Sequence, residues 1–108
     1  MSEQSALRIV IIVCSPDKPA LFDIGEVYLT IGAKHTLHDL KIEPVKLIKR
    51  HITGDWGELP HDDIAENKYA LKHKGRILSS YQIAEGVKVW VITEAGWEVT
   101  TILLPSEY

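Results

Sequence analysis

Short apolar runs near the start of the chain predict strands. The run from Ala6 to Cys14 is rich in β-branched residues, is too short for a typical helix, and is followed by a proline-containing turn at residues 15–19. A weaker run, Val27 to Thr30, predicts a second strand that stops at Gly32. We therefore expect two strands in the first third of the chain.

The middle of the chain has the spacing of amphipathic helices. Residues 33–40 have room for about two turns, with leucines on one side. A longer helix is expected to begin at Glu43-Pro44, because proline is tolerated in a first turn, and to stop at Gly54. Its predicted buried stripe follows spacings of three and four and comprises Val45, Ile48 and Ile52.

The last half of the chain predicts a further helix and a three-stranded meander. The helix follows Pro60 and is expected to end at Gly75 with a left-handed cap. Three alternating runs then come with glycine-bearing connections of hairpin length: Arg76–Ile83, Val87–Glu94 and Val99–Leu104. The expected fold is α+β, in which a small antiparallel sheet, made of this meander and the N-terminal strand, packs against two or three helices in a single domain spanning residues 1–108.

Composition and charge narrow the function only slightly. Apolar residues make up 45% of the chain and charged residues 25%, as in ordinary globular proteins. The net charge of −3 gives no overall attraction to nucleic acid. Most of the lysines and arginines nevertheless lie between Lys41 and Arg76, so a local basic surface stays open beside the simpler interpretation of solvated helix faces.

The sequence suggests neither a membrane span nor a cofactor. The longest apolar run, Ile9 to Cys14, is far shorter than the roughly 20 residues that cross a bilayer, and we expect a cytoplasmic protein. The single cysteine, Cys14, excludes an internal disulfide and is expected to be a buried, inert thiol. Nucleotide-binding and zinc-binding motifs are missing, and His35 with His38 makes an incomplete metal site, so we expect no cofactor and no metal.

Three residues are candidates for catalysis. His51 is expected at the cationic end of a helix and is the candidate general acid or base, although a helix dipole also favours a histidine there for structural reasons. Arg76 is the candidate cation for a phosphate charge. Ser79 is the third candidate, as a hydrogen-bond donor to the same phosphate. Thr101, counted below among the binding residues, is the alternative donor, although strands favour threonine in any case.

Four residues are candidates for binding. Asp55 and Trp56 lie in a loop with two glycines, where the carboxylate is suited to capping backbone N–H groups. Trp56 is either a lid on the core or an exposed group that stacks on a base or anchors a partner. Trp97 and Thr101, in the C-terminal meander, complete the set.

Five segments resemble, in order and spacing, the pattern of a family of short bacterial proteins known as "plasmid-related protein". They are Arg50-His51, Gly54–Gly57, Gly75–Tyr81, Trp90–Ala95 and Thr100–Tyr108. The resemblance covers roughly residues 23–108 and leaves residues 1–22 as a strand and turn outside the family pattern.

The resemblance implies no particular reaction. It does imply that its motifs form one unit in which His51, Asp55 and Arg76 converge on a functional surface. Family members carry an acidic residue followed by arginine where this chain has Gly96-Trp97, so any activity that needs that arginine is expected to be lost or changed here.

Two functions stay open. The first is a non-enzymatic protein-binding module or regulator associated with mobile genetic elements, indicated by the acidic balance, by Trp56, Trp90 and Trp97, and by an N-terminal strand suited to pairing with a second copy. The alternative is a metal-independent ribonuclease of the toxin type, which would act on RNA with His51 as general acid or base and Arg76 as the phosphate-binding cation. The acidic charge counts against the nuclease.

Overall fold

The computed structural model describes the backbone of residues 6–9 and the whole of residues 19–108. Among these residues, no helix is both long and apolar enough to cross a membrane. The elements, in chain order, are β1 (Ala6–Ile9), β2 (Glu26–Thr30), α1 (Ile31–Asp39), α2 (Pro44–Ile52), α3 (His61–His73), β3 (Ile77–Ala84), β4 (Val87–Thr93), β5 (Val99–Leu103) and the 3₁₀ helix η2 (Pro105–Glu107).

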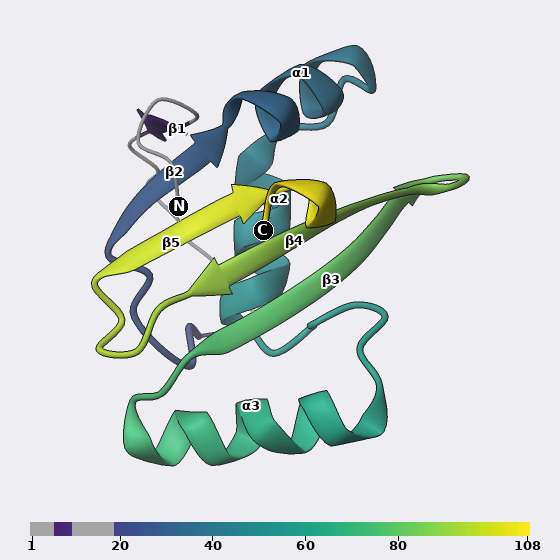
Figure 1. Ribbon diagram of the computed structural model, residues 1–108. Helices are drawn as coiled ribbons and strands as arrows, with labels where there is room; N and C mark the ends of the chain where they lie inside the picture. Colours follow the sequence, from purple (N-terminus) through teal and green to yellow (C-terminus); the bar gives the residue numbers. More distant parts are fainter. Residues whose placement is uncertain (1–5, 10–18) are drawn as a thin grey trace.

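The strands form one sheet in the order β1-β2-β5-β4-β3 (Figure 1). The predicted meander is present, since β3, β4 and β5 pair antiparallel. The expectation of a purely antiparallel sheet is wrong at one place, because β2 pairs with β5 in parallel, with Tyr28 opposite Thr101. Three helices and two strands separate β2 from β5, and such a long connection permits a parallel pair. The α+β class is confirmed.

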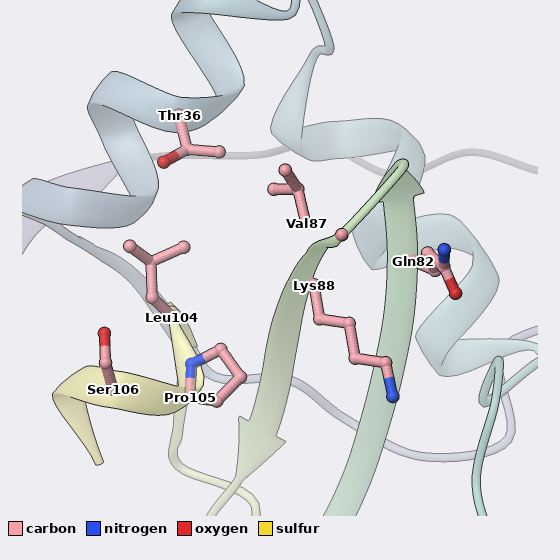
Figure 2. Close-up of a pocket in the computed structure, with 8 residues that line it drawn as sticks. Thr36, Gln82, Val87, Lys88, Leu104, Pro105 and Ser106 are labelled. Carbon is pink, nitrogen blue, oxygen red and sulfur yellow. The ribbon is translucent and has the colours of Figure 1, made fainter.

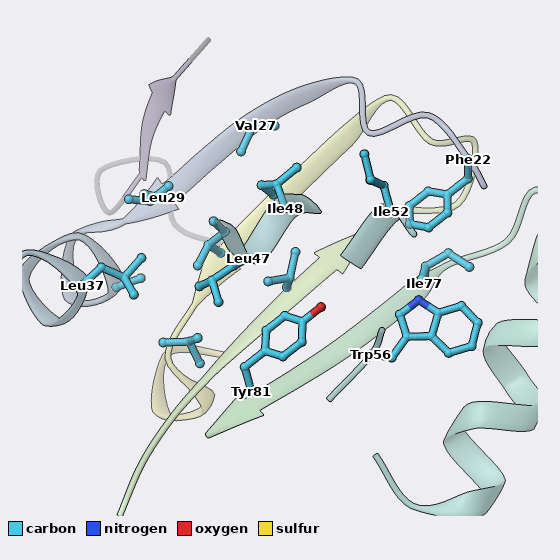
Figure 3. Close-up of a cluster of buried hydrophobic side chains, with 14 of the residues drawn as sticks. Phe22, Val27, Leu29, Leu37, Leu47, Ile48, Ile52, Trp56, Ile77 and Tyr81 are labelled. Atoms are coloured by element: carbon cyan, nitrogen blue, oxygen red, sulfur yellow. The ribbon is translucent and has the colours of Figure 1, made fainter. Parts of the chain in front are cut away.

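The two faces of the sheet differ. Helices α1 and α2 pack on one face and enclose the hydrophobic core, whereas η2 and the C-terminus lie on the other (Figure 1). Helix α3 runs beside the edge strand β3. Figure 3 shows core side chains from the sheet meeting those of α1 and α2; they include Val27, Leu29, Leu37, Leu47, Ile48 and Tyr81.

Helix α1 begins earlier than the sequence suggested. Gly32, expected to stop a strand, lies in the first helical turn, and Thr30 caps the helix by accepting a hydrogen bond from the N–H of Ala33. Glu107 completes the cap, because one carboxylate oxygen accepts from the Gly32 N–H and the other from the Thr30 hydroxyl and the Leu104 N–H. The C-terminal motif therefore holds the start of α1.

The two longer helices follow the prediction with two corrections. In α2 the buried residues are Leu47, Ile48, His51 and Ile52, so His51 belongs to the stripe that faces the core. In α3 the left-handed cap is Lys74, with φ 56°, and not Gly75. At position 75 a Cβ would lie 3.1 Å from the Cβ of Ala70, a tight contact that favours glycine there.

The predicted strand bounds are correct to within one residue in the meander. Strand β3 begins and ends one residue later than expected, and β4 and β5 each end one residue earlier. Strand β1 covers the start of the first predicted strand; residues 10–14, with Cys14, lie outside the described residues.

Asn67 closes the outer edge of β3. Its side-chain amide donates to the Leu78 carbonyl at 2.7 Å and accepts from the Leu78 N–H at 3.0 Å, which imitates a neighbouring strand. Asn67 is 2% exposed, so both hydrogen bonds are shielded from water. An otherwise unpaired sheet edge is thereby satisfied by a helix side chain.

We expect Asn67→Ala to lower the free energy of unfolding by about 1–3 kcal/mol, because it leaves both backbone groups of Leu78 without partners. Urea unfolding followed by circular dichroism measures the change. The control is Lys68→Ala at the adjacent exposed position, which should stay within about 0.5 kcal/mol of wild type. Equal effects of the two substitutions would contradict this role.

Candidate functional site

His51 lies in the core and bonds through both ring nitrogens. Its Nδ1 is 2.6 Å from Ser79 Oγ and its Nε2 is 2.9 Å from Thr93 Oγ1. Thr93 Oγ1 is 2.7 Å from Thr100 Oγ1, which in turn donates to the backbone carbonyl of Ile24 at 2.7 Å. A continuous chain of hydrogen bonds therefore joins α2 to β3, β4 and β5.

The carbonyl at the end of this chain sets the direction of every bond in it. A carbonyl can only accept, so the single hydroxyl proton of Thr100 points to Ile24. Thr100 Oγ1 must then accept from Thr93, and Thr93 must accept from His51. His51 is consequently the Nε2–H tautomer, and its Nδ1 accepts the proton of Ser79.

Burial keeps His51 neutral. His51 and Ser79 are both 0% exposed, and the ring of Phe22 packs edge-on against the imidazole at 5.1 Å. Loss of hydration lowers the pKa of His51 to about 3. The structure thus brings two of the candidate catalytic residues, His51 and Ser79, into contact, but it places both away from solvent, where Ser79 has no access to a phosphate.

The loop after α2 is built into the edge of the sheet. Trp56 accepts from the Ser80 N–H at 3.0 Å, and the Glu58 N–H donates to the Ser80 carbonyl at 2.7 Å. Gly57 has φ +73°, and a Cβ there would lie 2.1 Å from the Ser80 oxygen, so only glycine fits. Trp56 is 7% exposed and its Nε1 donates to the His51 carbonyl, which favours the lid interpretation over the exposed one.

Asp55 anchors the same loop. Its carboxylate accepts two hydrogen bonds from Arg50, at 2.7 and 3.2 Å, and a third from the Gly57 N–H. The Arg50 guanidinium also lies 4.3 Å from the ring centre of Tyr81, whose hydroxyl donates to the Asp55 carbonyl. Asp55 therefore caps backbone as expected, and its predicted binding role has no separate support.

Arg76 lies on the opposite face of the sheet from His51. Its neighbour Ile77 is fully buried in the core, so Arg76 points the other way, where it contacts the C-terminal residue Tyr108. Its Nη2 donates to the Tyr108 hydroxyl at 3.1 Å, and its guanidinium lies 5.5 Å from the centre of that ring. The convergence of His51, Asp55 and Arg76 that the resemblance implied does not occur.

Trp97 supports the end of the core. Its Nε1 donates to the Gly75 carbonyl at 2.7 Å, and its ring lies 5.5 Å from that of Phe22. Phe22 in turn covers His51. At the position where the resemblance led us to expect an acidic residue followed by arginine, Trp97 is therefore a half-buried side chain with a packing role.

The remaining predicted residue, Thr101, lines a pocket on the sheet face that carries η2. We call it the open-face pocket; its volume is about 380 Å³, and it is lined by Ile92, Glu94, Thr101, Leu103, Glu107 and Tyr108. Thr101 is 5% exposed, and no hydrogen bond joins its hydroxyl to any residue that the structure describes, whereas Thr30, Thr93 and Thr100 are all bonded. None of the buried side-chain oxygens or nitrogens of the described residues lacks a hydrogen-bond partner, so the unbonded Thr101 hydroxyl is reached by solvent and is open to a ligand.

Aromatic residues flank the open-face pocket. Tyr108 is 72% exposed and packs edge-on against Trp90 at 5.6 Å, with Arg76 beside it. Trp90 was an expected interface aromatic from the sequence, whereas Tyr108 and Glu94 were not predicted as site residues. The alternation of β4 was the available signal, since it places Trp90, Ile92 and Glu94 on one face.

A larger hollow of about 470 Å³ lies between α1, the β3–β4 hairpin and η2 (Figure 2). None of its lining residues is buried, so it offers no polar group that needs a partner. The open-face pocket is the better candidate site. Among the described residues, no group of three or more potential metal ligands gathers.

Comparisons of this chain with protein-family models, with curated proteins and with solved structures found no match. The resemblance to the plasmid-related family therefore stays a prediction.

We expect His51 to make stability depend on pH. Its pKa is about 3 when folded and near 6.5 when unfolded, so the unfolded state binds more protons between these values. Stability is complete above about pH 7 and falls by about 2 kcal/mol by pH 5. Urea unfolding across this range measures the loss.

His51→Gln should remove this pH dependence, and His73→Gln, at an exposed position of α3, should retain it. A wild-type free energy of unfolding that stays flat between pH 7 and pH 5 would contradict the burial of a neutral histidine.

Proposed function

We propose that the protein is a non-enzymatic module that binds a protein partner in the cytoplasm, as a regulator associated with mobile genetic elements. The binding surface is the sheet face opposite α2, centred on the open-face pocket. The observation that carries the proposal is the cluster of Arg76, Trp90 and Tyr108 beside the unbonded hydroxyl of Thr101.

Residue type and position both support this surface. Tryptophan, tyrosine and arginine are the side chains that most often dominate the energy of protein interfaces. Arg76 and Tyr108 are exposed, so neither is needed to fill the core. On the opposite face α1 and α2 cover the sheet, and the hollow of about 520 Å³ beside these helices has no tryptophan, tyrosine or arginine among the described residues that line it.

The ribonuclease alternative has less support. General acid-base catalysis at a phosphate needs the proton carrier and the cation within reach of the same group. His51 is enclosed with both nitrogens bonded, and Arg76 lies across the sheet from it. The geometry therefore favours the binding module.

Affinity capture from a lysate of the host cell, followed by titration of the purified partner, tests the proposal. We expect Tyr108→Ala to raise the Kd for the partner by about tenfold or more, because the substitution removes an exposed anchor from the centre of the surface. Leu40→Ala is the control, because Leu40 is 38% exposed at the C-terminal end of α1 and lines neither the open-face pocket nor the groove beside Arg76. Equal binding by wild type and Tyr108→Ala would contradict the proposed surface.

Incubation with total RNA tests the alternative. We expect background cleavage by wild type, by His51→Ala and by Arg76→Ala, which keeps the core intact because Arg76 is exposed. Cleavage by the wild-type protein that disappears in Arg76→Ala would instead favour the nuclease.

A further inference from the structure

We infer that the open-face pocket receives a basic side chain, arginine or lysine, from the partner. In this arrangement the Glu94 carboxylate supplies the opposite charge and the Thr101 hydroxyl accepts a hydrogen bond. The inference rests on the proposed function and specifies the chemistry of the same site.

The pocket has the size and floor for one long side chain. Its volume of about 380 Å³ lies near the lower end of the range for ligand sites, about 300–1,000 Å³. Ile92 and Leu103, each 2% exposed, supply an apolar floor. The methylene groups of lysine or arginine pack on such a floor while the charged end reaches polar groups.

The charges around the pocket favour a cation. Two glutamates line it, Glu94 and Glu107, and none of the described lining residues is a lysine or an arginine. Glu107 is engaged at the start of α1 by three hydrogen bonds. Glu94 is exposed, and its carboxylate has no ion pair or hydrogen bond with the residues that the structure describes, so it is available to an incoming cation.

The Thr101 hydroxyl and the Tyr108 ring are also suited to binding an arginine or lysine side chain. Arginine and lysine are donors without an acceptor, and the Thr101 hydroxyl can accept from either. Tyr108 adds an aromatic face of the kind that attracts cations, as its contact with Arg76 shows. Arg76 itself does not line the pocket and donates to the Tyr108 hydroxyl, and among the described residues it forms no ion pair with Glu94.

Titration with small probes, followed by backbone amide NMR, tests the inference. N-acetyl-arginine amide is expected to bind and to shift the resonances of Ile92, Thr101 and Leu103. N-acetyl-citrulline amide has nearly the same shape without the charge and should bind at least about fivefold more weakly.

Two substitutions locate the site. Glu94→Gln and Thr101→Val should each raise the Kd of N-acetyl-arginine amide by about fivefold. Each substitution removes one polar partner of the probe and preserves the shape of the side chain. Glu85→Gln, at the exposed tip of the β3–β4 hairpin, is the matched control and should leave binding unchanged.

The inference is overturned if the arginine probe does not bind, if the citrulline probe binds equally well, or if N-acetyl-glutamate binds instead and shifts Arg76. Any of these results leaves the proposed function standing as long as Tyr108→Ala still weakens the partner. If the arginine probe binds but Tyr108→Ala leaves the partner unaffected, the partner does not use this face, and both the proposed function and the inference fail.

Discussion

The hydrogen-bond chain from Ser79 through His51 to Thr100 is the constraint on which the rest of the structure depends. It places polar groups in the centre of the core and satisfies each of them, which is the condition for burying such groups without a large loss of stability. Because its end is the backbone carbonyl of Ile24, it also fixes the segment that leads into β2. The sheet face that α1 and α2 cover therefore serves to stabilise the fold.

The motifs that first suggested a functional unit serve that structure in distinct ways. The loop from Gly54 to Gly57 pairs with the outer edge of β3, and Asn67 closes the remainder of that edge. Glu107 holds the start of α1, and Trp97 packs on Phe22 above His51. Most of these motifs are thus explained by packing, and the recognition surface that we propose is the opposite face, with Arg76, Trp90 and Tyr108.

Elements defined by local patterns could be predicted, whereas features that depend on distant residues could not. The meander and the two longer helices follow from alternation, helical spacing and their boundary residues. The parallel pairing of β2 with β5 depends on the path of the whole chain. Spacing alone could have placed His51 beside Ile48 and Ile52, but the two hydroxyls that bond its ring come from Ser79 on β3 and Thr93 on β4, which are distant in the sequence. The open-face pocket likewise joins Glu94, Thr101 and Tyr108, which no local pattern connects.

The central claim is that His51 is a neutral structural residue and that recognition lies on the other face. The most direct test is the ¹⁵N NMR spectrum of the His51 ring as pH is lowered from 8 to 5. The account predicts a single Nε2–H tautomer throughout this range, since Thr93 accepts from Nε2 and burial lowers the pKa to about 3. A ring that titrates near pH 6.5, or that carries its proton on Nδ1, would contradict the account.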